Sequence, residues 1–268
     1  MAYLAELDTR LLLYIQDTLR YEPLHSFWRG ISFLGDLGWF WIFTGILLAL
    51  NSKTRTAGIT AIAALVLSTF ISNVILKNAV MRPRPFEVLP QIIPLITHAS
   101  GYSFPSGHTT AAFACAFVYY KLLPKFFGLP IMLLAVMVAF SRLYLGVHYP
   151  TDVLAGLLIG AGIAIIWQLI YWKAYKARLY IYFIFALLTL PLLFIERTAT
   201  HSMFQVSAIT LATALGLLIE DKFIRFPDTK NWGCRILRLI ITALVAVIPF
   251  ALLSLLPEGE WFSFLKYF

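Results

Sequence analysis

Charged residues are scarce in this chain, and their scarcity excludes a water-soluble protein. Asp, Glu, Lys and Arg make up 13% of the 268 residues, whereas 60% are hydrophobic. A soluble domain keeps roughly a quarter of its residues charged. Because this deficit accompanies long apolar runs, lipid rather than water is the main solvent of the chain.

Cysteine and acidic residues are also few. Cys115 lies in an apolar run and Cys234 in a basic loop, and neither has a partner nearby in the sequence, so no disulfide framework is expected. The net charge is +8. Basic cytoplasmic loops of a membrane protein account for such a charge, and no nucleic-acid partner is expected. Glu6, Asp8 and Arg10 stand where a signal peptide needs an apolar core, so a cleavable signal is not expected either.

Eight apolar segments are long enough to cross a bilayer, which takes about 20 helical residues. Residues 1–20 instead form an amphipathic pattern interrupted by charges, which favours a helix in the membrane interface. The sequence therefore predicts an all-α, polytopic transmembrane helix bundle. Its parts are an interfacial helix within 1–28, a six-span core over 29–198 and a two-span C-terminal extension over 199–268. The predicted spans lie near 33–50, 57–78, 106–123, 128–147, 151–172, 179–196, 202–220 and 236–256.

The basic residues of alternate loops indicate the orientation, because cytoplasmic loops carry an excess of Lys and Arg. One side holds twelve of them: Lys53, Arg55, Lys121, Lys125, Lys173, Lys176, Arg178, Lys222, Arg225, Lys230, Arg235 and Arg238. The other side holds seven: Arg10, Arg20, Arg29, Arg82, Arg84, Arg197 and Lys266. We expect the first side to be cytoplasmic and both termini to lie outside.

Three polar clusters interrupt the apolar pattern at the ends of spans. They are Lys77–Pro85, Tyr102–Thr109 and Ser141–Asp152. The span order puts all three on one face of the membrane, the face with fewer basic residues. A lone Lys or Arg at a span end often only extends toward the interface. Three clusters together favour a functional reading, since charges at such depth are expensive, and they predict a site that opens to the outside.

The residue types of these clusters indicate a phosphate site. Lys77, Arg84 and Arg142 supply three cations, and the guanidinium fork matches paired phosphate oxygens. Ser106 and Gly107 stand where a helix begins, so backbone N–H groups can face an anion, and Gly107 has no side chain to obstruct it. Ser and Gly are also ordinary at helix starts, so this segment alone leaves both readings open.

His148, His108 and Asp152 can supply the chemistry. Cleavage of a phosphomonoester needs a nucleophile for phosphorus and a proton for the departing oxygen, which His148 and His108 can provide. Asp152 follows His148 by four residues, across Pro150, and can orient its ring; it can also cap the next helix. The acidic residues are few and none pairs with another beside a histidine at metal-ligand spacing, so no metal and no cofactor are expected.

Three segments in this order resemble the tripartite signature of the type-2 phosphatidic acid phosphatases, whose superfamily includes vanadium haloperoxidases. The segments are Lys77–six residues–Arg84-Pro85, Pro105-Ser106-Gly107-His108 and Ser141-Arg142–five residues–His148–three residues–Asp152. The resemblance covers roughly residues 1–175. It implies a metal-independent phosphatase core with a phosphohistidine on His148, His108 as proton donor to the leaving alkoxide and Asp152 as the residue that orients His148. It also implies that the cations, Ser106 and Gly107 hold the phosphoryl oxygens.

The resemblance favours a lipid phosphatase of the bacterial cytoplasmic membrane with its site on the periplasmic side. Undecaprenyl pyrophosphate ranks first as substrate, followed by phosphatidylglycerol phosphate, and then by lipid A phosphate and phosphatidic acid. A lipid transporter or binding protein without turnover is an alternative of another class, and a haloperoxidase is a third. Arg82 is additional to the signature and is interpreted as solvated in preference to a ligand of a second phosphate or of a lipid headgroup. Bilayer lipids are expected partners, and a homo-oligomer is possible.

Overall fold

The computed structural model of the chain describes residues 2–51, 53–96, 99, 101–173, 215, 219, 222–223, 231–237 and 240. The chain divides into two compact units, Met1–Leu169 and Ile170–Phe268. All eight candidate site residues belong to the first unit. The predicted spans at 179–196, 202–220 and 236–256 and the predicted boundary at 198 fall outside the described residues, except for a few positions.

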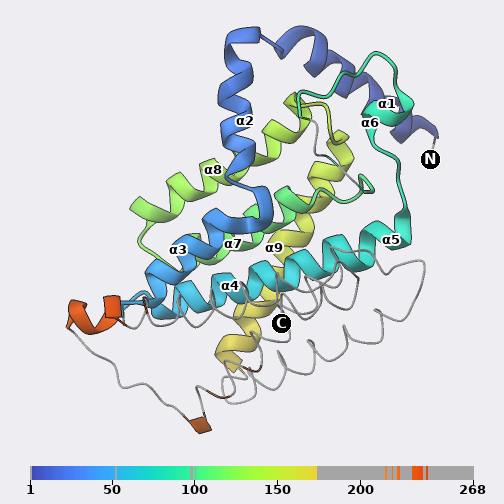
Figure 1. The fold of residues 1–268 in the computed structure, drawn as a ribbon. Coiled ribbons are helices and arrows are strands. Elements are labelled where there is room, and N and C mark those ends of the chain that lie inside the picture. The colour runs from blue at the N-terminus through green and yellow to red at the C-terminus, as the bar shows by residue number, and fades with distance from the viewer. Residues whose placement is uncertain are drawn as a thin grey trace, which may run out of the picture. The chain divides into compact units, whose positions relative to one another are not determined.

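The described part of the first unit is helical, with no strand among the described residues, as the sequence predicts (Figure 1). Pro150 begins the helix Pro150–Lys173, where its missing N–H costs nothing, and Asp152 in the first turn suits the positive helix end. The α-helices are α1 Ala2–Tyr14, α2 His25–Phe33, α3 Trp39–Ala49, α4 Arg55–Thr69, α5 Lys77–Val80, α6 Pro85–Val88, α7 Gly107–Leu122, α8 Lys125–Tyr144 and α9 Pro150–Lys173. Short turns of other helix types are η1 Ile15–Leu19, η2 Glu22–Leu24, η3 Asp36–Gly38 and η4 Phe70–Leu76.

Three stretches of the described chain are long and apolar enough to cross a membrane. They correspond to the predicted spans at 57–78, 128–147 and 151–172, and they run over Arg55–Val88, Lys125–Tyr144 and Pro150–Leu169. The helix α3 is apolar but only 11 residues long, and α7, in the predicted span 106–123, has 16. The total of eight spans stays a prediction.

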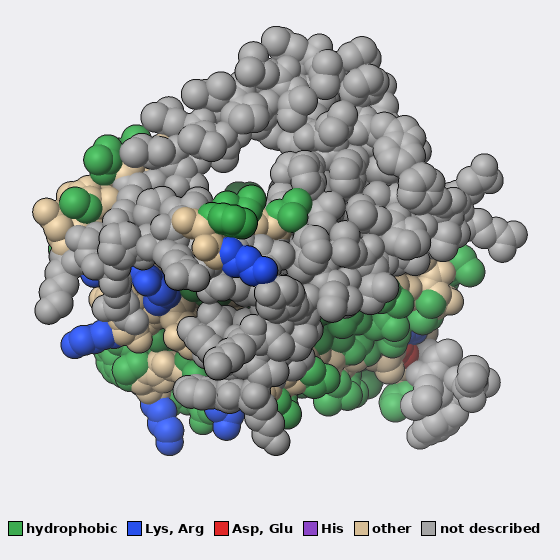
Figure 2. Space-filling model, turned by 90° about the horizontal axis from the view of Figure 1, so that it is seen from below, with side chains coloured by type: hydrophobic (Ala, Val, Ile, Leu, Met, Phe, Trp, Pro, Cys, Tyr) green, Lys and Arg blue, Asp and Glu red, His purple; other side chains and the backbone are tan. Residues whose placement is uncertain are grey.

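The outward faces of α8 and α9 are apolar, as lipid contact requires. On α8, Leu129 and Leu133 are 55% and 61% exposed, and on α9, Leu154 and Leu158 are 56% and 62% exposed. Their four-residue spacing places each pair on one side of its helix. Hydrophobic side chains also cover much of the described surface on the face shown in Figure 2, with scattered Lys and Arg. A surface of this kind suits lipid rather than water.

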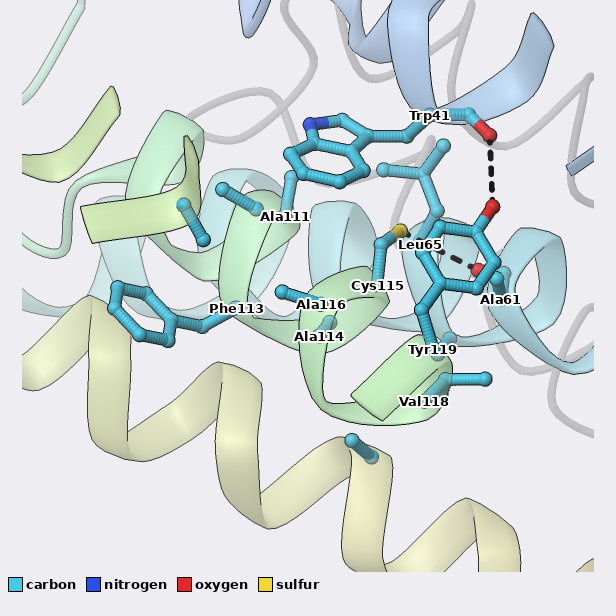
Figure 3. Packing of buried hydrophobic residues seen from close by; sticks show 14 of the residues in the cluster. Trp41, Ala61, Leu65, Ala111, Phe113, Ala114, Cys115, Ala116, Val118 and Tyr119 are labelled. Atoms are coloured by element: carbon cyan, nitrogen blue, oxygen red, sulfur yellow. Dashed lines mark hydrogen bonds between the residues drawn. The ribbon is translucent and has the colours of Figure 1, made fainter. Parts of the chain in front are cut away.

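The core of the first unit is built around α7, which packs against α4 and α8 (Figure 1). Residues 111, 112, 114 and 116 of α7 are all alanine and buried, and such small residues let neighbouring helices approach closely. Cys115 contacts the Ala61 carbonyl at 3.6 Å, and the Tyr119 hydroxyl lies 3.5 Å from the Trp41 carbonyl (Figure 3). These contacts fix the position of α7, whose first residues belong to the candidate site.

The N-terminal segment is helical over α1 and η1, as the amphipathic pattern predicts. Leu7, Leu11 and Tyr14 are exposed, whereas Leu12 and Gln16 are buried. Leu12 packs with Ile92 and Tyr149, two residues from the loops around the candidate site. The buried side of this segment therefore faces these loops, while its position in the membrane interface stays a prediction.

Candidate active site

His148 lies in the turn between α8 and α9, and the other candidate residues surround it. It is only 1% exposed. Burial lowers the pKa of His148 well below its ordinary value of 6.5, and the positive charges of Arg84, Arg142 and Lys77 act in the same direction. His148 is therefore a neutral imidazole at neutral pH. A neutral ring keeps a nitrogen lone pair, which a nucleophile needs.

The two ring nitrogens of His148 face different partners. Nε2 lies 3.5 Å from Arg84 Nη1, and Nδ1 lies 3.5 Å from Asp152 Oδ2. Nδ1 forms no hydrogen bond with Asp152 at this distance, and among the described residues none donates to or accepts from Nδ1. Catalytic hydrogen bonds are often long before substrate binds. The structure thus brings together the predicted pair of His148 and Asp152 without a formed hydrogen bond.

Asp152 is fully buried and held by several donors. Its Oδ2 accepts hydrogen bonds from the Ser103 hydroxyl and, at 2.8 Å, from the Tyr149 backbone N–H. Its Oδ1 accepts one from Arg82 Nη1 at 2.7 Å. Its backbone carbonyl accepts the Ser106 N–H at 3.1 Å. Asp152 therefore does more than cap α9, because it connects the start of α9 with the start of α7.

The two predicted arginines are buried beside His148 and anchored at one side. Arg84 donates from Nε to the Gly101 carbonyl at 2.8 Å and from Nη1 to the Val147 carbonyl at 3.0 Å. Arg142 donates from Nη1 to the Ser32 hydroxyl. Its Nε is buried and, within the described part of the chain, has no acceptor. A buried donor without an acceptor is costly, and a phosphate oxygen can satisfy it.

Lys77 begins α5 and is close enough to His148 for its charge to matter. Arg84 immediately precedes α6, where its backbone N–H donates to Glu87 Oε2 at 2.7 Å. Met81, between the two cations, has a positive φ of 50°. This turn ends α5 and returns the chain, so that Arg84 reaches the same pocket as Lys77.

The N-terminus of α7 is shaped as the sequence predicts. Ser106 precedes the helix and Gly107 begins it, and no described side chain caps this end. The Ser106 hydroxyl accepts from Thr109 Oγ1 at 2.9 Å instead. A Cβ atom on Gly107 would lie 2.6 Å from Asn73 Oδ1, so glycine lets η4 approach α7 here. The first N–H groups of α7 therefore remain available for an anion.

His108 has a partner that sequence reasoning misses. Its Nε2 lies 2.6 Å from Asp36 Oδ1, and Asp36 begins η3. Ser32, the partner of Arg142, lies one helical turn earlier in the chain. The available signal was an acidic residue at the edge of an apolar run, since such charges are rare without a role. The segment 32–36 therefore belongs to the site, together with the three predicted clusters.

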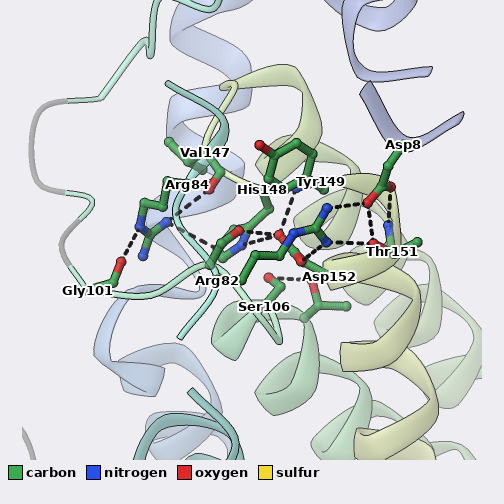
Figure 4. A network of polar contacts seen from close by, with 12 residues as sticks. Asp8, Arg82, Arg84, Gly101, Ser106, Val147, His148, Tyr149, Thr151 and Asp152 are labelled. Atoms are coloured by element: carbon green, nitrogen blue, oxygen red, sulfur yellow. Dashed lines mark hydrogen bonds and ion pairs between the residues drawn. The ribbon is translucent and has the colours of Figure 1, made fainter. Parts of the chain in front are cut away.

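The interpretation of Arg82 as solvated is wrong. The Arg82 side chain is 23% exposed and donates to Asp8 at 2.6 Å as well as to Asp152 (Figure 4). Its guanidinium also lies 3.8 Å from the centre of the Tyr149 ring. The sequence gives no indication of this contact, because Asp8 is 74 residues away. The hydrogen bonds from Arg82 to two buried carboxylates replace the hydration that its guanidinium would have in water.

No group of three or more His, Cys, Asp or Glu residues that could hold a metal ion occurs in the described part of the chain. The positive charges near His148 come from Lys77, Arg84 and Arg142. The arrangement suits binding of a tetrahedral anion beside a neutral imidazole.

Comparisons with known proteins agree with this geometry. Residues 57–176 match the family model of the PAP2 superfamily. Undecaprenyl-diphosphatase of Sulfolobus acidocaldarius is 33% identical over 148 residues, covering 54% of this chain and 71% of that protein. Lipid A 4'-phosphatase of Bacteroides thetaiotaomicron is 31% identical over 172 residues, covering 59% and 74%. The crystal structure of a transmembrane PAP2 type phosphatidylglycerolphosphate phosphatase from Bacillus subtilis matches with a TM-score of 0.53 and 27% identity over 63% of this chain and 86% of that one.

The resemblance inferred from the three sequence segments is confirmed. The matched region contains Lys77, Ser106-Gly107-His108 and the segment from Arg142 to Asp152. The relatives named above are membrane or lipid phosphatases by name, and the described helices include three that can cross a membrane. The chain is thus a membrane protein with phosphatase relatives, and it belongs to the PAP2 superfamily.

Proposed function

We propose that the chain is a membrane lipid phosphatase that transfers a phosphoryl group from its lipid substrate to His148 and then to water. The observation that carries this proposal is the buried Arg142 Nε, which has no acceptor among the described residues and lies in a cationic pocket around a neutral His148. The names of the relatives support lipid phosphatase activity.

Lys77, Arg84 and Arg142 would bind the oxygens of the phosphoryl group, together with the N–H groups at the start of α7. Charge-assisted hydrogen bonds from arginine are among the strongest available to a phosphate. They gain importance in the transition state, where charge spreads over the equatorial oxygens. Ser106 and Gly107 contribute through their backbone.

In the first step, the lone pair of His148 Nε2 attacks the terminal phosphorus while the bond from that phosphorus to the leaving oxygen breaks. The leaving oxygen belongs to the lipid alcohol of a monophosphate or to the inner phosphate of a diphosphate. The electron pair of that bond leaves with the oxygen, which takes a proton from His108. Asp152 faces Nδ1 at 3.5 Å and stabilises the positive charge that develops on the ring. Asp36 lies against Nε2 of His108, which leaves Nδ1 of that ring for proton transfer.

In the second step, water attacks phosphorus and the P–N bond to His148 breaks. His108, now neutral, takes the proton of the attacking water, and orthophosphate departs. His148 returns to its neutral form, and His108 returns to its protonated form. None of these steps needs a metal ion, because the cations of the chain neutralise the phosphoryl charge.

Undecaprenyl pyrophosphate is the substrate that we favour, with phosphatidylglycerol phosphate, lipid A phosphate and phosphatidic acid as alternatives. The names of the relatives support the first three. We also propose that the chain lies in a bacterial cytoplasmic membrane with the site on the periplasmic side. The excess of basic residues in the opposite loops supports this orientation.

A panel of lipid phosphates tests the proposal. Purified protein in detergent, treated with EDTA, should release orthophosphate from at least one of undecaprenyl pyrophosphate, phosphatidylglycerol phosphate, lipid A and phosphatidic acid. Stoichiometric lipid binding without release would instead favour the transporter or binding protein. Loss of release in EDTA with rescue by a divalent ion would contradict the metal-independent mechanism.

A further inference from the structure

The N-terminal helix presents a regular stripe of side chains to the turn that carries His148. Asp8, Leu12, Gln16 and Arg20 follow one another at intervals of four residues: the first two lie in α1, Gln16 lies in η1 and Arg20 follows η1 directly. Gln16 Nε2 donates to the Leu143 carbonyl at 2.7 Å, and Arg20 Nε donates to the Tyr144 carbonyl at 3.0 Å. These carbonyls belong to the last turn of α8, which needs such donors.

At the other end of this stripe, Asp8 binds the first turn of α9. It is 3% exposed. Its Oδ1 accepts the Thr151 backbone N–H at 2.8 Å, and its Oδ2 accepts the Thr151 hydroxyl. Oδ2 also accepts Arg82 Nη2 at 2.6 Å. Asp8 therefore connects α1 both to the residue beside Asp152 and to the arginine that binds Asp152.

Arg82 completes a closed set of contacts around Asp152. One terminal nitrogen, Nη1, donates to Thr151 Oγ1 at 2.8 Å and to Asp152 Oδ1 at 2.7 Å, while the other binds Asp8. Figure 4 shows Arg82 between the two carboxylates. Because both terminal nitrogens are engaged, Arg82 is poorly placed to bind a second phosphate of the substrate.

The contact with Arg82 fixes the direction of the Asp152 carboxylate together with the Ser103 hydroxyl and the Tyr149 N–H, which hold the other oxygen. Oδ1 is occupied by Arg82, so the other oxygen, Oδ2, faces His148 Nδ1. Without Arg82 the carboxylate would keep only the two donors on Oδ2 and could turn about that oxygen, which would shift its approach to His148 Nδ1. Small displacements of a catalytic group cost large factors in rate.

We propose that Asp8 and Arg82 are positioning residues: Arg82 holds the Asp152 carboxylate toward His148, and Asp8, on the N-terminal helix, holds Arg82. The inference rests on the proposed phosphatase activity and goes beyond it, because it makes α1 a working part of the site. The N-terminal helix and Asp152 are then connected through Arg82 and through Thr151.

The test compares Asp8→Asn, Arg82→Gln, Arg82→Lys and the double variant Asp8→Asn/Arg82→Gln with the wild type. Asp17→Asn serves as a matched control, because Asp17 is exposed on the same N-terminal segment. Arg10→Gln serves likewise, because Arg10 pairs only with the exposed Glu6 in the described structure. The assay measures kcat and KM with one lipid monophosphate and one lipid diphosphate, and Ki for orthophosphate.

We expect kcat to fall about tenfold or more in Asp8→Asn and Arg82→Gln, on both substrates, with little change in KM. Arg82→Lys should recover part of the activity, since it keeps the charge. The double variant should be no slower than Arg82→Gln, because both changes break one chain of contacts. Ki for orthophosphate should stay within about twofold, because the phosphate-binding cations remain in place.

Three outcomes would overturn the inference. A kcat equal to that of Asp17→Asn would mean that the contacts do not position Asp152. A higher KM confined to the diphosphate would make Arg82 a substrate ligand. Loss of orthophosphate binding along with activity would show a general structural role. Absence of phosphate release by the wild type would instead contradict the proposed function. That result is distinguishable from failure of the positioning role, because it does not depend on any variant.

Discussion

Gly156 allows α9 to pack directly on the turn that begins α7, and replacing it with alanine tests how closely the site depends on this contact. A Cβ atom at this position would lie 2.9 Å from the Ser106 carbonyl oxygen, 3.0 Å from Thr109 Cβ and 3.2 Å from Thr110 Oγ1. The nearest of these is backbone, which cannot rotate away. The Ser106 oxygen already accepts Thr110 N and Thr110 Oγ1, each at 2.9 Å.

The geometry gives the size of the effect. An ordinary contact begins at 3.4 Å, so Gly156→Ala must move α9 away from Ser106 by about 0.5 Å. Overpacking of this kind costs about 1–3 kcal/mol of stability. Asp152 lies four residues earlier in α9, and the Ser106 N–H binds its carbonyl at 3.1 Å. The displacement of α9 therefore also moves Asp152, and we expect kcat to fall about tenfold.

The assay pairs Gly156→Ala with two other variants of α9. Gly162→Ala is the matched control, because no atom of the described residues outside its own helix lies within 4 Å of the added Cβ, and alanine favours the helix by about 0.5–1 kcal/mol. Gly160→Ala meets α7 at the Thr110 carbonyl oxygen, which is its nearest neighbour, and at Ala114 N and Phe113 Cβ, 3.0 and 3.1 Å away. This contact is closer than any at Gly156, so Gly160→Ala should lower thermal stability in detergent more than Gly156→Ala does. If Gly156→Ala is as stable and as active as Gly162→Ala, the reasoning is refuted.

Two further predictions concern the charge and the orientation of the site. The acid limb of the pH profile of kcat/KM should lie below pH 6.5, because burial and then Arg84 lower the pKa of His148, and protonation of the ring removes the nucleophile. Arg84→Gln removes one of these positive charges and should move the limb to higher pH. An acid limb at or above pH 6.5 in the wild type would contradict this prediction. Orientation is tested with Gln91→Cys in a Cys234→Ser background, in which the remaining native cysteine, Cys115, is buried. Position 91 is exposed, so its new thiol should react with an impermeant thiol reagent in intact cells. Reaction only after lysis would place the site in the cytoplasm.

The sequence identifies the parts of the site that follow from local pattern. Each cluster falls at the end of an apolar segment, where a charge or a helix start is visible without a structure. Lys77, Gly107 and His148 were therefore assigned from their neighbours in the chain, and the structure places Lys77 close enough to His148 for its charge to act on the ring and Gly107 at the start of α7. The all-helical architecture follows from the same pattern of apolar segments.

The residues that sequence reasoning misses act across long separations. Asp8 meets Thr151 143 residues away, Ser32 meets Arg142 110 residues away and Asp36 meets His108 72 residues away. No spacing rule connects such pairs, because only the packing of α1 and α2 against the later helices creates them. Arg82 was misinterpreted for the same reason: its two carboxylate partners come from opposite ends of the first unit.

Trapping of the covalent intermediate tests the central claim most directly. Wild type, His148→Ala and His25→Ala are mixed with a lipid substrate that carries a ³²P label in its terminal phosphate and are quenched in denaturant at high pH. His25 begins α2 and contacts the Tyr144 ring, so its variant controls for loss of a histidine outside the proposed chemistry. In the wild type and in His25→Ala, we expect label bound to His148 that is stable in base and lost in acid. In a folded His148→Ala, we expect neither bound label nor phosphate release. Turnover by His148→Ala, or label on another residue, would contradict the central claim.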